Sequence, residues 1–139
     1  MIGLDTNVLA RYYLAGHQAD AATTRQQLAA RRLIEGNQPL YVAKTVLLEL
    51  EWVMRGAYAS TREHFASVLD HLLASPHVKV EDRLSIEAAL IGHRSGLDFA
   101  DALHHATYRT CAAMASFDDR KFARRANKLG LAPVVSVPR

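Results

Sequence analysis

The sequence has little of what marks a secreted or membrane protein. It contains a single cysteine, Cys111, so the chain cannot form an internal disulfide. No uninterrupted apolar run approaches the roughly 18 residues of a membrane-spanning helix, and the amino terminus lacks the basic and apolar regions of a secretory signal. We therefore expect a cytoplasmic protein in which Cys111 is a small core residue of a helical stretch.

The sequence also lacks internal repeats, low-complexity tracts and linkers, and none of its histidines has a spacing typical of a zinc site. A chain of 139 residues, 50% of them hydrophobic and 22% charged, is long enough for one domain with a full core. It is too short for two ordinary domains. We therefore expect a single domain over residues 1–139.

Neither sign of charge is in large excess. Seventeen Lys and Arg residues against fourteen Asp and Glu give a net charge of +3, with an isoelectric point near 9.2. Residues 119–139 hold one acid and six basic residues: Arg120, Lys121, Arg124, Arg125, Lys128 and Arg139. This distribution permits a polyanionic partner, and it also fits a solvated helix face.

Short apolar runs alternate with segments of helical periodicity. The predicted strands are residues 2–4, 40–43, 78–80, 112–117 and 134–137. The predicted helices are residues 8–13, 20–35, 45–54, 65–73, 84–95, 98–110 and 120–129, with a break at Gly16-His17-Gln18 and a capping box at Ser60-x-x-Glu63. This alternation predicts an α/β fold, a doubly wound, mostly parallel sheet flanked by helices. The weight of helix between the second and later strands predicts a helical arm over residues 45–75 that belongs to the same core.

The first predicted strand ends at an acid, Asp5, and Thr6 or Asn7 can cap the helix that follows. In open α/β sheets ligands bind at the carboxyl ends of the strands, where loops and helix amino termini converge. Asp5 is therefore a candidate site residue. A lone Asp at such a junction can also be a plain helix cap.

The sequence predicts different environments for the other acids: burial, an ion pair or a position at a helix start. Glu49 has apolar residues at most of its three- and four-residue neighbours, which predicts a buried carboxylate, whereas Glu51 precedes Arg55 by four residues and predicts a solvated ion pair. Asp98 is a natural helix cap, and Asp101 follows it at the third helical position.

Asp118 ends the strand predicted at residues 112–117, much as Asp5 ends the first strand, and Asp119 can cap the next helix. A doubly wound sheet would bring Asp5, Glu49, Asp101 and Asp118 to one edge. Like charges about 5 Å apart repel by roughly 3 kcal/mol at an effective dielectric of about 20. Such a cluster makes sense around Mg²⁺ or Mn²⁺, which prefer oxygen ligands and promote phosphodiester hydrolysis.

These residues resemble the PIN-domain family, specifically a VapC-type toxin of a type II toxin–antitoxin pair. The motifs that carry the resemblance occur in family order and span almost the whole chain: Gly-Leu-Asp5-Thr-Asn7-Val-Leu, Leu-Leu-Glu49-Leu, Asp98-Phe-Ala-Asp101-Ala-Leu and Ser116-Phe-Asp118 before a basic helix. The resemblance implies a metal-dependent endoribonuclease with Asp5, Glu49, Asp101 and Asp118 as its catalytic metal ligands.

The resemblance further implies that the hydroxyls of Thr6 and Ser116 help to orient the site, with Asn7 and Asp98 as further supporting residues. Many relatives have Thr in place of Ser116. The basic residues expected to contact RNA are Arg120, Lys121, Arg124 and Arg125. The implied partners are an RNA, which in relatives is often tRNA, a second copy of the chain, and a cognate antitoxin that blocks the site. The apolar helices over residues 47–54 and 65–73 could offer a groove for it, and they could equally be plain core.

Other classes of protein fit parts of the pattern. A phospho-acceptor receiver domain usually carries an acidic pair at its first strand end, where this chain has Asp5 alone, and a Lys after its last functional strand. A haloacid-dehalogenase-like phosphatase needs a second Asp where this chain has Asn7. A non-catalytic metal-binding interaction module in a regulatory complex, or a housekeeping PIN nuclease, is the main alternative.

Overall fold

The computed structural model describes residues 1–14 and 20–139. The predicted break at residues 16–18 lies outside the described residues. The chain divides into two compact units, Met1–Glu81 and Asp82–Arg139, and each is described by itself. The single domain expected from the sequence stays a prediction.

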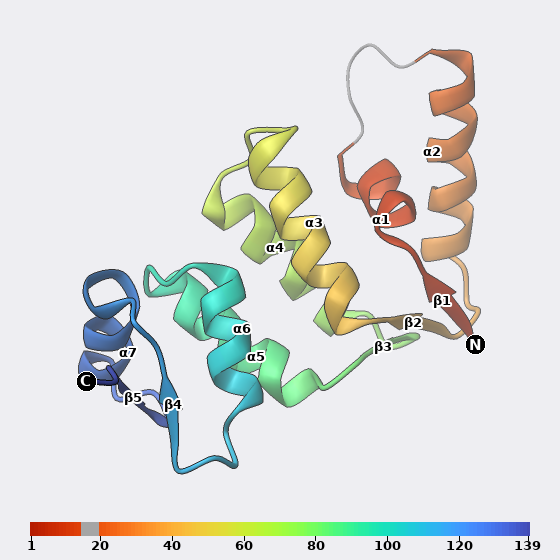
Figure 1. The fold of residues 1–139 in the computed structure, drawn as a ribbon. Coiled ribbons are helices and arrows are strands. Elements are labelled where there is room, and N and C mark those ends of the chain that lie inside the picture. The colour runs from red at the N-terminus through yellow and green to blue at the C-terminus, as the bar shows by residue number, and fades with distance from the viewer. Residues whose placement is uncertain (15–19) are drawn as a thin grey trace. The chain divides into compact units, whose positions relative to one another are not determined.

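The first unit consists of alternating strands and helices (Figure 1). In chain order these are β1 (Ile2–Leu4), α1 (Thr6–Tyr13), α2 (Ala21–Ile34), β2 (Leu40–Val42), α3 (Lys44–Gly56), α4 (Arg62–Ala74) and β3 (Val78–Val80). The strands form a parallel sheet in the order β1-β2-β3. Helix α1 packs against α2 and α3, and α4 packs against β3. The register pairs Leu4 with Val42 and Val42 with Val80, so the three strands end level with one another.

The helical arm predicted over residues 45–75 is part of the core of the first unit. Helix α3 buries apolar residues at three- and four-residue spacing, and α4 does the same with Phe65, Val68, Leu69 and Leu72. Leu47, Leu50 and Leu69 are fully buried. The buried apolar stripes of both helices therefore belong to the core of the first unit.

The structure decides between helix caps that the sequence left open. Of the three candidates for α1, the cap is Asp5 and not Thr6 or Asn7, since the Asp5 carboxylate accepts a hydrogen bond from the Thr6 amide at 2.8 Å. Thr61, and not Ser60, caps α4 by accepting from the His64 amide at 3.1 Å. Because a cap needs an extended backbone as well as an oxygen, the choice between adjacent candidates is made by the chain entering the helix.

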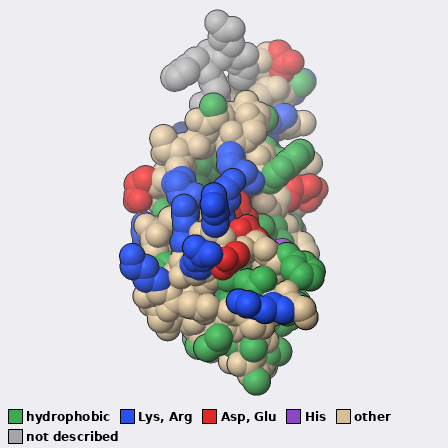
Figure 2. All heavy atoms as spheres, turned by 60° about the vertical axis from the view of Figure 1, so that its left-hand side comes forward, with side chains coloured by type: hydrophobic (Ala, Val, Ile, Leu, Met, Phe, Trp, Pro, Cys, Tyr) green, Lys and Arg blue, Asp and Glu red, His purple; other side chains and the backbone are tan. Residues whose placement is uncertain are grey.

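The second unit contains α5 (Arg83–Arg94), α6 (Phe99–Thr107), β4 (Ala113–Ala115), η1 (Asp119–Ala123), α7 (Arg124–Lys128) and β5 (Val134–Ser136). Here η1 is a single π-helical turn that leads directly into α7. Helices α5 and α6 pack closely, because a Cβ at Gly92 would lie only 3.2 Å from that of Ala102. Strands β4 and β5 are parallel. Figure 2 brings the α7 side of Figure 1 forward and shows Lys and Arg side chains gathered on that face, with Asp and Glu side chains beside them.

The predicted α/β class with parallel strands is confirmed. In the described part of the chain the strands are divided over two sheets, and the last strands are shorter than predicted. Cys111 is exposed after the end of α6, so its prediction as a core residue was wrong. In the part of the chain that the structure describes, no helix combines the length and apolar character of a membrane span.

Candidate active site

The carboxyl edge of the first sheet carries two acids. Because the three strands end level, Asp5 follows β1, Ala43 follows β2 and Glu81 follows β3 at equivalent positions. With neighbouring strands about 4.8 Å apart, Asp5 and Glu81 lie roughly 10 Å apart along this edge. The Asp5 side chain is exposed and bonds the start of α1. Asp5 is therefore a helix cap that also faces solvent.

The role of Glu81 at this edge was not predicted from the sequence. Its carboxylate accepts a hydrogen bond from the Lys44 amide at 2.8 Å, which supplies the cap that Ala43 cannot give α3. The two residues are far apart in the sequence and meet only because β2 and β3 pair. No local pattern could have indicated this contact. Glu81 thus holds the helix that carries Glu49.

Helix α3 exposes Glu49 and buries Glu51, the reverse of the expectation. The buried residues of α3 share one face: Leu47, Leu50, Glu51 and Met54. At about 100° per residue, Glu49 falls on the opposite side together with the exposed Trp52. The apolar character of a neighbour such as Trp52 was taken as a sign of burial, and that inference was wrong. Exposure makes the Glu49 carboxylate accessible to solutes.

Glu51 pairs with Arg55 as predicted, and the pair is only half solvated. Arg55 Nε lies 3.1 Å from a Glu51 carboxylate oxygen, and the Glu51 side chain is 11% exposed against 60% for Arg55. The prediction of a solvated pair was therefore wrong for the acid. A buried carboxylate held by one arginine has a structural role in α3.

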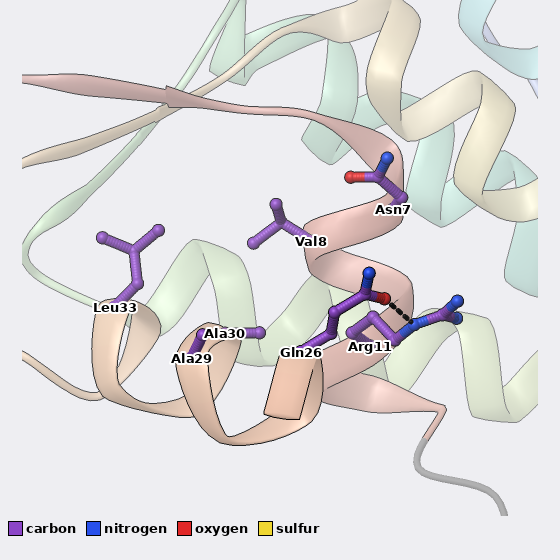
Figure 3. A pocket seen from close by; sticks show the side chains of 7 residues that line it. All are labelled: Asn7, Val8, Arg11, Gln26, Ala29, Ala30 and Leu33. Atoms are coloured by element: carbon purple, nitrogen blue, oxygen red, sulfur yellow. Dashed lines mark hydrogen bonds between the residues drawn. The ribbon is translucent and has the colours of Figure 1, made fainter. Parts of the chain in front are cut away.

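Two supporting residues lie at the start of α1. Thr6 is buried, and its hydroxyl oxygen has no hydrogen-bond partner among the described residues. Asn7 is exposed and lines a hollow of about 410 Å³ between α1 and α2 (Figure 3). Arg11 lines the same hollow and donates to the Gln26 side chain at 2.8 Å. Asn7 thus faces a space beside α2, and Thr6 faces the interior.

In the second unit, Asp98 and Asp101 lie together at the start of α6. Asp98 caps the helix as predicted, accepting from the Asp101 amide at 3.2 Å. Burial raises the pKa of the Asp101 carboxyl above its usual range, and the negative charges of Asp98 and Asp118 raise it further, against a lowering by His104. The charges of Asp98 and Asp118 therefore act on the Asp101 carboxyl. The repulsion expected among Asp5, Glu49, Asp101 and Asp118 together stays a prediction.

Asp118 is held at the end of the segment after β4. Its carboxylate accepts from the Lys121 amide at 3.1 Å, so Asp118 caps η1. Its own amide donates to the Ser116 hydroxyl at 3.1 Å. Asp119, which the sequence favoured as the cap, instead pairs with Arg124 at 2.7 Å. The tight turn into η1 therefore moves the cap one residue earlier than predicted.

The basic residues predicted to contact RNA, Arg120, Lys121, Arg124 and Arg125, are all exposed. Arg124 is partly neutralised by Asp119. These side chains belong to η1 and α7, directly after Asp118, so positive charge follows a candidate site acid within one or two helical turns.

A divalent cation would suit the donor set in chemical terms. Mg²⁺ and Mn²⁺ prefer carboxylate oxygens, and a cation would relieve the repulsion that raises the pKa of Asp101. Within residues 1–14 and 20–139, no group of three or more His, Cys, Asp or Glu side chains has a geometry that could hold a metal ion. Asp5 and Glu49 belong to the first unit, and Asp101 and Asp118 to the second. That these four form one site stays a prediction.

The fold and its acids define a class: an α/β protein with short parallel strands and carboxylates at strand ends and helix starts. A model of the PIN domain family matches residues 2–128, so the chain belongs to the PIN domain family. PIN domains are generally nucleases, and membership therefore indicates a nuclease. A comparison with curated proteins found no match.

Proposed function

We propose that the protein is an endoribonuclease that requires Mg²⁺ or Mn²⁺, with Asp5, Glu49, Asp101 and Asp118 as its metal ligands. The observation that carries this proposal is the match of residues 2–128 to a nuclease family. The carboxylates at the start of α6 and before η1 support it, because the charges of Asp98 and Asp118 act on the partly buried Asp101 and raise its pKa together with burial. Carboxylates that repel one another destabilise the folded protein, and a bound cation would remove that repulsion.

We propose separate roles for the bound cation, for the residues that position the acids and for the basic residues. A bound cation would supply Lewis-acid chemistry, polarising a phosphodiester oxygen and lowering the pKa of an attacking water. Ser116 fixes the backbone of Asp118, and Asp98 fixes the first turn of α6 beneath Asp101. Exposed groups such as Arg120 and Arg125 would hold the RNA backbone through its phosphates.

We propose that residues 1–139 act as one functional domain. The family match runs from residue 2 to residue 128 and so includes most of both units. The proposed ligands also come from both units. A fragment containing only one unit should therefore be inactive.

We further propose that the nuclease is the VapC-type toxin of a toxin–antitoxin pair, acts in the cytoplasm, forms a homodimer and is inhibited by a cognate antitoxin. The order of its motifs supports this. Overexpression of the gene alone should arrest growth, and co-expression of a small protein encoded beside it should restore growth. If overexpression is harmless and no neighbouring gene encodes an inhibitor, a housekeeping PIN nuclease becomes the better description.

The test of the nuclease is cleavage of RNA by the purified protein, first stripped of metal with a chelator and then supplied with Mg²⁺ or Mn²⁺. Cleavage should appear only after the metal is added, and the Glu49→Gln variant should stay inactive under the same conditions. RNA binding should weaken as the salt concentration rises, because phosphate contacts release counterions. Activity that survives exhaustive chelation would overturn metal dependence. Metal binding without cleavage of any RNA would favour a non-catalytic interaction module.

A further inference from the structure

The turn from β2 into α3 has no side chain of its own that closes it. Strand β2 ends at Val42 and α3 begins at Lys44, so a single residue, Ala43, makes the connection. The Ala43 backbone is extended, and its methyl group cannot accept a hydrogen bond from the first amides of α3. The first turn of α3 holds no acid either. A group from another element is therefore needed to fix the start of this helix.

Glu81 bonds the chain on both sides of this turn. Its backbone amide donates to the Val42 carbonyl at 2.9 Å, and its carboxylate accepts from the Lys44 amide at 2.8 Å. The first bond continues the pairing of β3 with β2, two strands that run side by side before α3 begins (Figure 1). The second bond places a negative charge at the amino end of α3, where the helix dipole favours it. Glu81 thus ties the start of α3 to the edge of the sheet.

The same helix carries a proposed metal ligand close to this tie. Glu49 follows Lys44 by five residues, or about 7.5 Å along the helix axis at 1.5 Å per residue. The other proposed ligand of the first unit, Asp5, follows β1 at the same edge of the sheet as Glu81. A shift or tilt at the start of α3 would therefore move Glu49 relative to Asp5. Functional side chains need to be held within about 0.5 Å of their working positions.

We propose that Glu81 is a positioning residue for Glu49. It fixes the start of α3 and, through the helix, the place of the Glu49 carboxylate relative to Asp5. This inference rests on the proposed function, in which both carboxylates hold a divalent cation. Glu81 acts without touching that cation, through its bond to the Lys44 amide. Residues that orient metal ligands in this indirect way typically contribute roughly 10–100-fold in metal affinity or activity.

Two measurements on the full-length protein test the role of Glu81. The first is hydrogen exchange of the Lys44 amide without metal, and the second is the Kd for Mn²⁺ without RNA. Glu81→Ala removes the acceptor, and we expect it to lose protection at Lys44 and to bind Mn²⁺ about tenfold more weakly. Glu81→Gln keeps an oxygen that can accept from the amide, so both values should stay near those of the wild type. If Glu81→Ala does not fold, Glu81→Asp, which is shorter by one methylene group, should show the same two losses.

Two further variants separate positioning from general stability. Glu51→Gln weakens α3 away from its amino end, because Glu51 is bonded to Arg55 one turn further along. It should leave the protection of the Lys44 amide and the Kd for Mn²⁺ unchanged. Glu35→Ala removes a half-exposed carboxylate of the first unit that is paired with Arg31, and it should also change neither value.

An unchanged Kd for Mn²⁺ in Glu81→Ala would overturn the inference. An equal loss in Glu51→Gln would do so too, because the effect would then be one of helix stability. Equal weakening in Glu81→Gln and Glu81→Ala would show that the charge matters and the bond to Lys44 does not, which also overturns it. A wild type that neither binds Mn²⁺ nor cleaves RNA would defeat the proposed function and this inference together. A wild type that does both, with an unchanged Kd in Glu81→Ala, would defeat the positioning role alone.

Discussion

Replacing Glu51 by Gln should weaken the fold and spare catalysis, whereas replacing Glu49 by Gln should spare the fold and remove catalysis. The two acids are two residues apart on α3, and both changes remove one charge with almost no change in shape. The contrast depends on their opposite environments. The Glu51 side chain is 11% exposed and bound to Arg55, while Glu49 faces solvent.

The cost of Glu51→Gln follows from the geometry of the pair. An exposed ion pair one helical turn apart contributes about 0.3–0.5 kcal/mol, and breaking a fully buried pair costs about 3–5 kcal/mol. Here the acid is buried and Arg55 is 60% exposed, so solvent screens the arginine and the loss should be about 1–2 kcal/mol. For a chain of this size that corresponds to a fall in Tm of about 4–8 °C.

The assay is thermal unfolding of the metal-free protein, combined with RNA cleavage well below the Tm of each variant. Arg55→Ala is the matched control, because it leaves the Glu51 carboxylate buried with its arginine removed. It should destabilise at least as much as Glu51→Gln, and the double variant should lose less than the sum of the two. Glu49→Gln should change the stability by less than about 0.5 kcal/mol.

The opposite result would be that Glu51→Gln unfolds at the wild-type temperature and loses cleavage, while Glu49→Gln keeps cleavage. That outcome would place the site acid on the buried face of α3. A loss of stability in Glu49→Gln equal to that in Glu51→Gln would instead mean that the two sides of the helix are not distinguished as described.

Two further pairs of measurements follow from the second unit. Asp118→Asn should lose metal-dependent cleavage and keep the fold, since Asn caps a helix start about as well as Asp. Asp119→Asn should keep cleavage and lose only an exposed ion pair to Arg124, which is worth under about 1 kcal/mol. Cleavage that followed Asp119 instead would show the site acid to be misplaced by one residue. The raised pKa of Asp101 means that its ionised form destabilises the folded state. As the pH rises from the ordinary Asp value of about 3.9 through the raised value, the metal-free wild type should lose stability relative to Asp101→Asn. Urea unfolding at several pH values measures this difference, and parallel curves for the two proteins would contradict it.

Most helices and strands and the α/β class could be predicted from local sequence patterns. Strands at residues 2–4 and 78–80 were predicted with the bounds that the structure gives them, and the helix capped by Asp20 was also predicted correctly. These features depend on local physics: side-chain periodicity, cap chemistry and the conformational limits of glycine and proline. The order of the acidic motifs likewise indicated the PIN family, which the family match confirms.

The burial of the individual acids could not be predicted, because it depends on the packing of the helices that carry them. Helix α3 is apolar on several sides, so the face turned inward, with Glu51 on it, was fixed by the packing of the first unit, where α1 lies against α3. Glu81 meets the Lys44 amide because β2 and β3 pair, although the two residues are far apart in the chain. The charge of Asp118 reaches Asp101 for the same kind of reason, since the two residues are far apart in the chain. Sequence periodicity records the neighbours of a residue along one helix or strand, whereas burial and charge coupling depend on which other elements pack against it.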